Sequence, residues 1–368
     1  MTSLVLDKNE EDDILTFTIS NINVSYANAI RRTILADIPT VVFETLPHEK
    51  NNSTFYVNTS KLNNEILKQR LSCIPIHIDD LEMPLEDYIL DIDIKNNSDN
   101  IIYVTTKDFR IKNLKTGKYL NSDLVNTIFP PNNITNQYID FCRLNNKISE
   151  TIPGQQLKLT CKFTISTASE NASFNVVSMC SYRNTPDYSA IDEQEVIKRE
   201  ELKEKFGDDE ESIEFQLQDW RKLDAKRIVL NDSFDFKIES IGVFKNIDIV
   251  KKSIMIIVNR LKNIESEYLN NPELIKNSNT TIENCFDIEL QNEDFTIGKI
   301  LEFTLYDNYY QKQELLTFCG FRKEHPHTPG STIRIAFNQE TSKELVVKYL
   351  IDSANIAIDF YMKLIKEF

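Results

Sequence analysis

The chain has 368 residues, of which 41% are hydrophobic and 27% charged, a length that allows two or three domains with cores of their own. No apolar run approaches the roughly 20 residues that a membrane span needs. The net charge is −15, with 57 acidic against 42 basic residues, which disfavours a free-standing nucleic-acid binder because such proteins usually carry a basic excess.

The N-terminal segment and the cysteines indicate an intracellular protein. Residues 1–13 are acidic and lack the basic and apolar regions of a secretory signal. The six cysteines are scattered, and none forms a Cys-x-x-Cys pair. We therefore expect reduced thiols that act as small buried hydrophobes, with no metal and no other cofactor.

The first predicted elements are a strand and a short helix. Ile14 to Ile19 alternates apolar and polar residues, which is typical of a strand. A helix should follow over Tyr26 to Ala36, with Ser25 as its N-cap, and Pro39 ends it.

One face of this helix is apolar, and the opposite face carries Asn28, Arg31 and Arg32 at i, i+3 and i+4. Arginines on a polar helix face can form charge-assisted hydrogen bonds with a partner. A solvated surface is nevertheless the more usual role of such a pair.

The middle of the chain has a different texture. In residues 47–164, short β-like runs alternate with clusters of Asn, Ser, Pro and Gly, which predicts a small, mostly β insert domain. Asp91 and Asp93 alternate on one of these strands, but without further ligands a solvated strand face is favoured over a metal site. Residues 189–227 are densely charged, which predicts a solvated helical or partly mobile excursion.

Two long segments, 247–269 and 342–368, carry one-sided apolar stripes with alternating three- and four-residue spacing, as in amphipathic helices. Thr341 and Glu344 predict a capping box at the start of the second helix. Each stripe requires a packing partner. The candidate contact residues are Val250, Ile254, Ile257 and Leu261 in the first helix and Leu350, Ala354 and Tyr361 in the second.

Each long helix follows a strand and a short helix, the second such pair being Cys285–Leu290 and Ile297–Tyr306. This order suggests two related α/β modules whose long helices pack together. Two independent helices that each cover their own sheet would give the same pattern, and the pattern alone leaves both possibilities open.

Four stretches resemble motifs of one family, the alpha-like subunits of multisubunit RNA polymerases. NVSYANAIRRTILADIPT, residues 23–40, resembles the family signature in which an Asn-Ala-x-Arg-Arg helix follows the first strand. RLSCIPI, residues 70–76, resembles a second family element, and residues 236–261 resemble the closing region with its dimerisation helix. Residues 294–335 resemble the smaller alpha-like partner.

In the smaller partner's pattern, the matching residues are Asp294, Thr296, Ile297, Gly298, Gly320, Phe321, His325 and Pro326. Two residues depart from it, since Phe295 stands where the motif has His and Lys299 where Asn is usual. The zinc-binding cysteine cluster of many larger partners is also missing, so the resemblance implies no metal. His325 and His327 lie in a Pro-rich turn, where packing or turn roles are expected rather than metal binding.

The resemblance implies an α+β fold with two alpha-like dimerisation modules, each a sheet plus a long helix, fused in one chain. The larger module would cover 1–46 and 165–270, the β-rich insert 47–164, and the smaller module 271–368. In cellular eukaryotes and archaea the two partners are separate polypeptides. The fused arrangement resembles the version encoded by large nucleocytoplasmic DNA viruses.

The resemblance also implies a function. The chain would be a non-catalytic platform on which two large catalytic subunits and small accessory subunits of a DNA-directed RNA polymerase assemble. It would meet DNA and RNA only through the complex and would need neither a membrane nor a homodimer. If viral, it would lie in the virion or a cytoplasmic viral factory, and otherwise in the nucleus. The predicted interface residues are Asn28, Arg31, Arg32, Gly298, His325, Pro326 and the stripe residues above.

The residues themselves contain no catalytic constellation. No phosphate-binding loop, nucleophile elbow or zinc-protease motif is present, and the aspartate-rich metal loop needed for nucleotidyl transfer is absent. The alternative function is a free-standing interaction protein, or a virion structural protein, that uses the alpha-like fold.

Overall fold

The computed structural model describes residues 4–149 and 151–368. The chain forms two compact units. The first consists of the chain up to Thr33 together with Met179–Glu239 and Val250–Phe368, and the second of Ile34–Ser178 and Ser240–Ile249. No helix in the described ranges combines the length and the apolar character that crossing a membrane would require.

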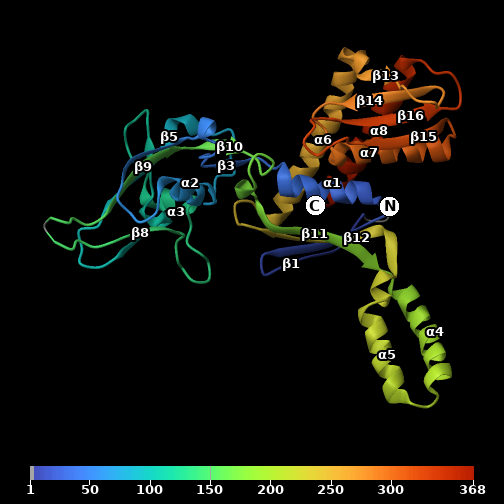
Figure 1. The fold of residues 1–368 in the computed structure, drawn as a ribbon, viewed down its shortest axis with the longest axis horizontal. Coiled ribbons are helices and arrows are strands. Elements are labelled where there is room, and N and C mark those ends of the chain that lie inside the picture. Colours follow the sequence, from blue (N-terminus) through green and yellow to red (C-terminus); the bar gives the residue numbers. More distant parts are fainter. Residues whose placement is uncertain (1–3, 150) are drawn as a thin grey trace. The chain divides into compact units, whose positions relative to one another are not determined.

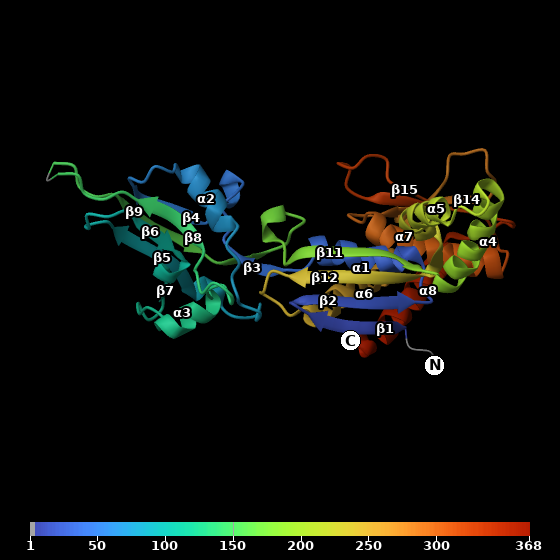
Figure 2. The same cartoon turned by 90° about the horizontal axis from the view of Figure 1, so that it is seen from below.

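The first unit contains a four-stranded sheet in which β1 (Val5–Glu11), β2 (Ile14–Ser20), β12 (Val229–Ser240) and β11 (Val177–Pro186) are neighbours in that order. Helices α1 (Val24–Ala36) and α6 (Asn246–Asn270) lie across one face of it (Figure 2). Phe17 of β2 pairs in register with Phe236 of β12, and their buried rings stack 5.1 Å apart. Alternation along the strands therefore places the apolar side chains under the helices.

A second four-stranded sheet lies in the same unit, in the order β13 (Ile275–Asn277), β14 (Cys285–Leu290), β16 (Ser331–Phe337) and β15 (Leu316–Arg322). It is accompanied by helices α7 (Phe295–Leu305) and α8 (Lys343–Leu364), as Figure 1 shows. Helix α7 continues as a π-helical segment, Tyr306–Lys312. Arg334 donates to Asp287 across the β14–β16 pair, with Nε at 2.6 Å from Oδ1.

Each long helix makes contacts with the other sheet and its helix. Tyr268, near the end of α6, donates its hydroxyl to the Glu289 carbonyl of β14 at 2.5 Å. Tyr361 of α8 donates to the Tyr26 carbonyl of α1 at 3.1 Å. Phe368, after α8, packs edge-on against Phe17 of β2 at 4.9 Å. The two sheets are thus linked by the helices that follow them.

The second unit is mostly β and has a hydrophobic core of its own, which includes Phe43, Phe109 and Phe141. The α-helices that lie wholly within its described residues are short, α2 (Asn64–Ser72) and α3 (Ser122–Ile128). Of the three sheets that its described residues form, the largest has the order β4 (Ser53–Asn58), β9 (Gln156–Lys162), β5 (Tyr88–Lys95) and β7 (Arg110–Asn113). The other two are the pairs β6 (Ile102–Thr105) with β8 (Asp140–Leu144), and β10 (Thr164–Ser166) with β3 (Thr40–Val42).

The charged excursion is a helical hairpin of α4 (Tyr188–Phe206) and α5 (Glu210–Lys222), visible in green and yellow in Figure 1. Leu202, Ile213 and Leu217 form a small core between its helices. Ion pairs add to this core, among them Arg221 with Glu195 and Glu214. The hairpin therefore has packing of its own even though most of its surface is charged.

Two predicted helix caps are wrong. Helix α1 begins at Val24, two residues earlier than expected, and the Asn23 side chain rather than that of Ser25 accepts an early backbone N–H, that of Ser25 at 2.9 Å. Helix α8 begins at Lys343, with Ser342 as its N-cap, so Thr341 and Glu344 form no capping box. The Thr341 hydroxyl donates instead to the Gln339 carbonyl at 3.0 Å.

The cysteines also differ in part from expectation, because Cys73 is exposed. Burial raises the pKa of four other thiols to about 12, which keeps them protonated and unreactive near neutral pH. These are Cys142, Cys161, Cys180 and Cys319.

Candidate functional site

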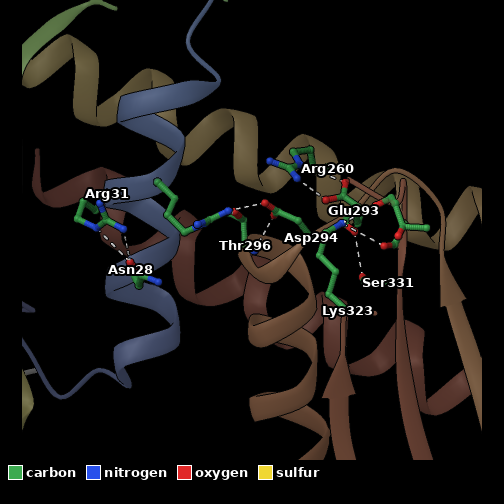
Figure 3. A network of polar contacts seen from close by, with 11 residues as sticks. Asn28, Arg31, Arg260, Glu293, Asp294, Thr296, Lys323 and Ser331 are labelled. Atoms are coloured by element: carbon green, nitrogen blue, oxygen red, sulfur yellow. Dashed lines mark hydrogen bonds and ion pairs between the residues drawn. The ribbon is translucent and has the colours of Figure 1, made fainter. Parts of the chain in front are cut away.

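The neighbouring arginines of α1 have different surroundings. Arg31 donates from Nε and Nη2 to the Asn28 side-chain oxygen at 3.1 and 2.9 Å, within its own helix. Both residues are partly exposed. Figure 3 shows them on the side of α1 that faces away from Thr296 and Asp294. This pair therefore keeps a basic group at the surface with part of its hydrogen-bonding capacity still available.

Arg32 turns to the other side and contacts the start of α7. Its Nε donates to the Thr296 hydroxyl at 2.9 Å, and its guanidinium forms an ion pair with Asp294. Asp294 is also the N-cap of α7, since its carboxylate accepts the Thr296 N–H at 2.9 Å. The sequence places both arginines on one polar face, whereas in the structure Arg31 bonds within its own helix and Arg32 bonds to the start of α7.

The electrostatics of Asp294 follow from this position. Burial raises the pKa of its carboxyl group, but the Thr296 N–H and the charge of Arg32 lower it by more, so the pKa lies below the ordinary value. A helix N-terminus stabilises a carboxylate in the same direction. Asp294 is therefore ionised at neutral pH and holds Arg32 as a charged pair.

A second arginine meets the same segment from α6. Arg260 donates to Glu293, with Nε at 3.1 Å from Oε1. The Ser331 hydroxyl of β16 donates to the Glu293 carbonyl at 2.9 Å. Figure 3 shows these groups gathered at the N-terminus of α7. The adjacent carboxylates of Glu293 and Asp294 thus form ion pairs with one arginine from α6 and one from α1.

Beside this polar network lies an aromatic cluster around Tyr26. Its hydroxyl is 3.0 Å from the Thr304 hydroxyl of α7, and its ring packs against Phe303 and Phe360. Burial raises the pKa of Tyr26 and raises that of Tyr361 further, so both hydroxyls remain protonated donors. Helix α1 is therefore bound to α7 and α8 by apolar contacts with satisfied polar tips.

Gly298 lies against Phe321, so the two parts of the smaller partner's pattern are in direct contact. A Cβ at this position would lie 2.0 Å from the Phe321 ring, so only glycine fits without movement of that ring. The two departures from the motif touch the same ring: Phe295 packs edge-on at 5.2 Å and the Lys299 ammonium lies 5.6 Å from its centre. Phe321 thus organises the first turns of α7.

The structure buries the predicted stripe residues completely or nearly so. His325 and Pro326 are exposed instead, in the turn between β15 and β16, and are not part of the network. His327 donates its N–H to the His325 ring at 3.1 Å. Within the described ranges, no group of three or more His, Cys, Asp and Glu side chains is placed to hold a metal ion.

Sequence reasoning missed Arg260, Glu293 and Tyr26 as contact residues. A usable signal existed for Glu293, because two acidic residues shortly before a predicted helix favour its N-terminus. No local pattern marks Arg260, whose partner lies 33 residues further along the chain.

This arrangement defines a class of protein in which two sheets are joined by the helices that follow them. Residues 16–261 match the family model described as the RNA polymerase Rpb3/Rpb11 dimerisation domain, and the chain belongs to that family. The resemblance seen in the motifs is thereby confirmed at the level of the family.

Named relatives agree with this assignment. DNA-directed RNA polymerases I and III subunit RPAC1 of Saccharomyces cerevisiae is 26% identical over 292 residues, which cover 69% of this chain and 83% of the relative. Human RPAC1 is 24% identical over 301 residues, with 70% and 82% covered. DNA-directed RNA polymerase subunit Rpo3 of Pyrococcus horikoshii is 34% identical over 110 residues, with 28% and 39% covered.

Proposed function

We propose that the chain is a non-catalytic assembly platform of a DNA-directed RNA polymerase. Membership of the Rpb3/Rpb11 dimerisation family and similarity to polymerase subunits support this role. The observation that carries it is the network at the N-terminus of α7, where Arg32 and Arg260 meet Asp294 and Glu293. Such contacts join the two sheets of the first unit through groups typical of a protein–protein interface.

The platform would contain two alpha-like modules in one chain: 1–46 with 165–270, and 271–368, while 47–164 forms the insert. Each module has a sheet, a short helix and a long helix, and each long helix contacts the other module's elements. Covalent linkage makes such pairing independent of the concentrations of two separate chains. This fused arrangement resembles that of large nucleocytoplasmic DNA viruses, so the proposal extends to viral transcription, in the virion or a cytoplasmic factory.

The surface offered to the two large catalytic subunits would include Asn28 and Arg31. Arg31 is partly exposed and is oriented by Asn28, which lowers the entropic cost of a bidentate bond to a partner carboxylate. Arg32 would act inside the platform. His325 and Pro326 lie in an exposed turn, where small accessory subunits could bind.

Co-expression with the two large polymerase subunits of the same genome tests this role. A tagged wild-type chain should recover both large subunits. Arg31→Glu should stay folded but lose them, because it places a like charge opposite the partner's carboxylates. Arg227→Glu is the matched control, since the Arg227 side chain is 83% exposed and, in the part of the chain that the structure describes, pairs only with Asp224 in the same turn.

Failure of the wild-type chain to recover the large subunits would contradict the proposal, as would their full retention by Arg31→Glu. Recovery of the chain alone from virions would instead favour the free-standing structural protein.

A further inference from the structure

The second unit contains a cavity of about 390 Å³ formed between β5, β7 and α3. Its floor includes the buried side chains of Phe109 and Val125, and its rim carries Lys107, Arg110 and Asn126. The volume lies within the range of roughly 300–1,000 Å³ that is usual for ligand sites. None of these residues belongs to the network around α7, so the cavity is independent of the proposed platform contacts.

The acidic groups at this cavity have their hydrogen bonds satisfied by the protein. Asp93 accepts from Lys158 at 2.7 Å and from Gln156 at 3.1 Å. Asp108 accepts the Thr105 N–H at 2.9 Å. The Lys158 bond holds the pKa of Asp93 below its ordinary value, so this carboxylate stays ionised and occupied. These acids are poor candidates for holding a ligand.

The basic side chains at the cavity, unlike the acidic ones, retain hydrogen-bonding capacity. Among the described residues, the Arg110 side chain makes neither a hydrogen bond nor an ion pair, and the Lys107 side chain makes only a cation–π contact with Tyr138, at 5.9 Å. Asn126 accepts the Tyr138 hydroxyl at 3.3 Å through its oxygen, which leaves its NH₂ group free to donate. The rim therefore carries an excess of donors, to which guanidinium contributes five N–H groups and ammonium three.

Charge alone would not bind a bare anion well here. Arg110 is paired in register with Asp91, and Asp93 also senses its charge, so nearby carboxylates weaken the positive potential at the rim. A ligand must therefore gain from the apolar floor as well as from the donors. A cavity with an apolar floor and a polar rim suits a side chain whose backbone continues on both sides.

We propose that this cavity binds an acidic peptide segment of a partner protein. An Asp or Glu side chain of the segment accepts hydrogen bonds from Arg110 and Lys107, and a neighbouring aromatic or aliphatic side chain packs on Phe109 and Val125.

Fluorescence anisotropy of the full chain with a labelled Ser-Asp-Phe-Glu-Leu-Ser peptide tests the proposal. The same peptide with Asn and Gln in place of its acids is the ligand control. Arg110→Ala should weaken binding about tenfold, the usual effect of losing a charge-assisted hydrogen bond. Asn126→Asp should weaken it too, while its oxygen can still accept the Tyr138 hydroxyl. Lys61→Ala, an exposed lysine of the same unit, should leave it unchanged.

Three results would overturn the proposal. No binding of the acidic peptide to the wild-type chain overturns the proposal, as does an equal loss with Lys61→Ala, which would mean general charge attraction. Tighter, Arg110-dependent binding of a single-stranded oligonucleotide would also overturn it, because the donors would then serve phosphates. An unchanged thermal unfolding profile for each variant shows that any loss arises at the cavity rather than from unfolding.

Discussion

Helices α1 and α7 occupy comparable places after the first strands of the two sheets in the first unit, yet their charges differ. Helix α1 carries Arg32 and has no acidic residue in its first turn. Helix α7 is preceded by Glu293 and capped by Asp294. A copy of α1 placed against another α1 would leave Arg32 without a carboxylate. The contact between α1 and the start of α7 therefore depends on opposite charges on the two helices. Such a contact favours pairing of two different helices over pairing of two copies of the same helix.

The apolar contacts do not discriminate in this way. The stripes of α6 and α8 are both buried and aliphatic or aromatic, and they share the same spacing. Burial of this kind supplies most of the free energy of packing but little choice of partner. We therefore assign most of the free energy of packing to the stripes, and the choice of packing partner to the network around the N-terminus of α7.

The largest effect is expected from charge placed in a stripe. Ile254 and Ile257 have no exposed surface. Changing both to Asp buries two carboxylates without partners, which costs several kcal/mol each and approaches the roughly 5–15 kcal/mol that stabilises a whole domain. We expect no folded soluble protein by circular dichroism and size exclusion. Met255→Asp is the control, since Met255 is 38% exposed on the same helix; assembly of the double variant with the large subunits would refute this packing.

A smaller effect is expected at Gly298. Gly298→Ala places a Cβ against the Phe321 ring and should destabilise the chain by about 2 kcal/mol, as overpacked sites do. In a Phe321→Ala background the clash is gone, so the same change should stabilise by up to about 1 kcal/mol through helix propensity. Urea unfolding of the four proteins measures both values. The same sign in both backgrounds would show that the ring contact is not the cause.

The Arg32–Asp294 pair should contribute about 1–2 kcal/mol, because both side chains remain about a third exposed. A double-mutant cycle with Arg32→Ala and Asp294→Asn isolates the coupling. The folded-state pKa of Asp294 is depressed, so its contribution is fully present above the unfolded-state pKa near 4 and is lost as the pH falls through the folded-state value. Coupling that persists at pH values below that folded-state pKa would contradict the assignment.

The sequence predicted what depends on local periodicity. The long helices were placed at 247–269 and 342–368, and they occupy Asn246–Asn270 and Lys343–Leu364. A sustained apolar stripe specifies a helix strongly, since every turn repeats the signal. The family-level assignment succeeded for a related reason, because the order and spacing of several motifs survive within one chain.

The sequence could not predict what depends on tertiary contact. The capping box at Thr341 failed by one residue, because the exact first turn is set by how α8 enters its packed position. Strands β9 and β10 are separated by Phe163 alone, yet β9 pairs with β4 and β5 while β10 pairs with β3. Arg32 and Asp294 are 262 residues apart, so no local pattern could join them.

The smallest effect on stability is expected from Arg31, which tests whether two adjacent arginines have different roles. Its side-chain hydrogen bonds lie within one helix turn and on its partly exposed side, so Arg31→Ala should change the free energy of unfolding by no more than about 0.5 kcal/mol. Arg32→Ala, measured beside it by urea unfolding, should cost clearly more. Equal losses of unfolding free energy in the two variants would make Arg31 a structural residue. A loss of the large subunits by Arg31→Glu would then report on stability rather than on partner binding. If Arg31→Ala leaves the free energy of unfolding almost unchanged, partner binding is the role that remains for its partly exposed guanidinium.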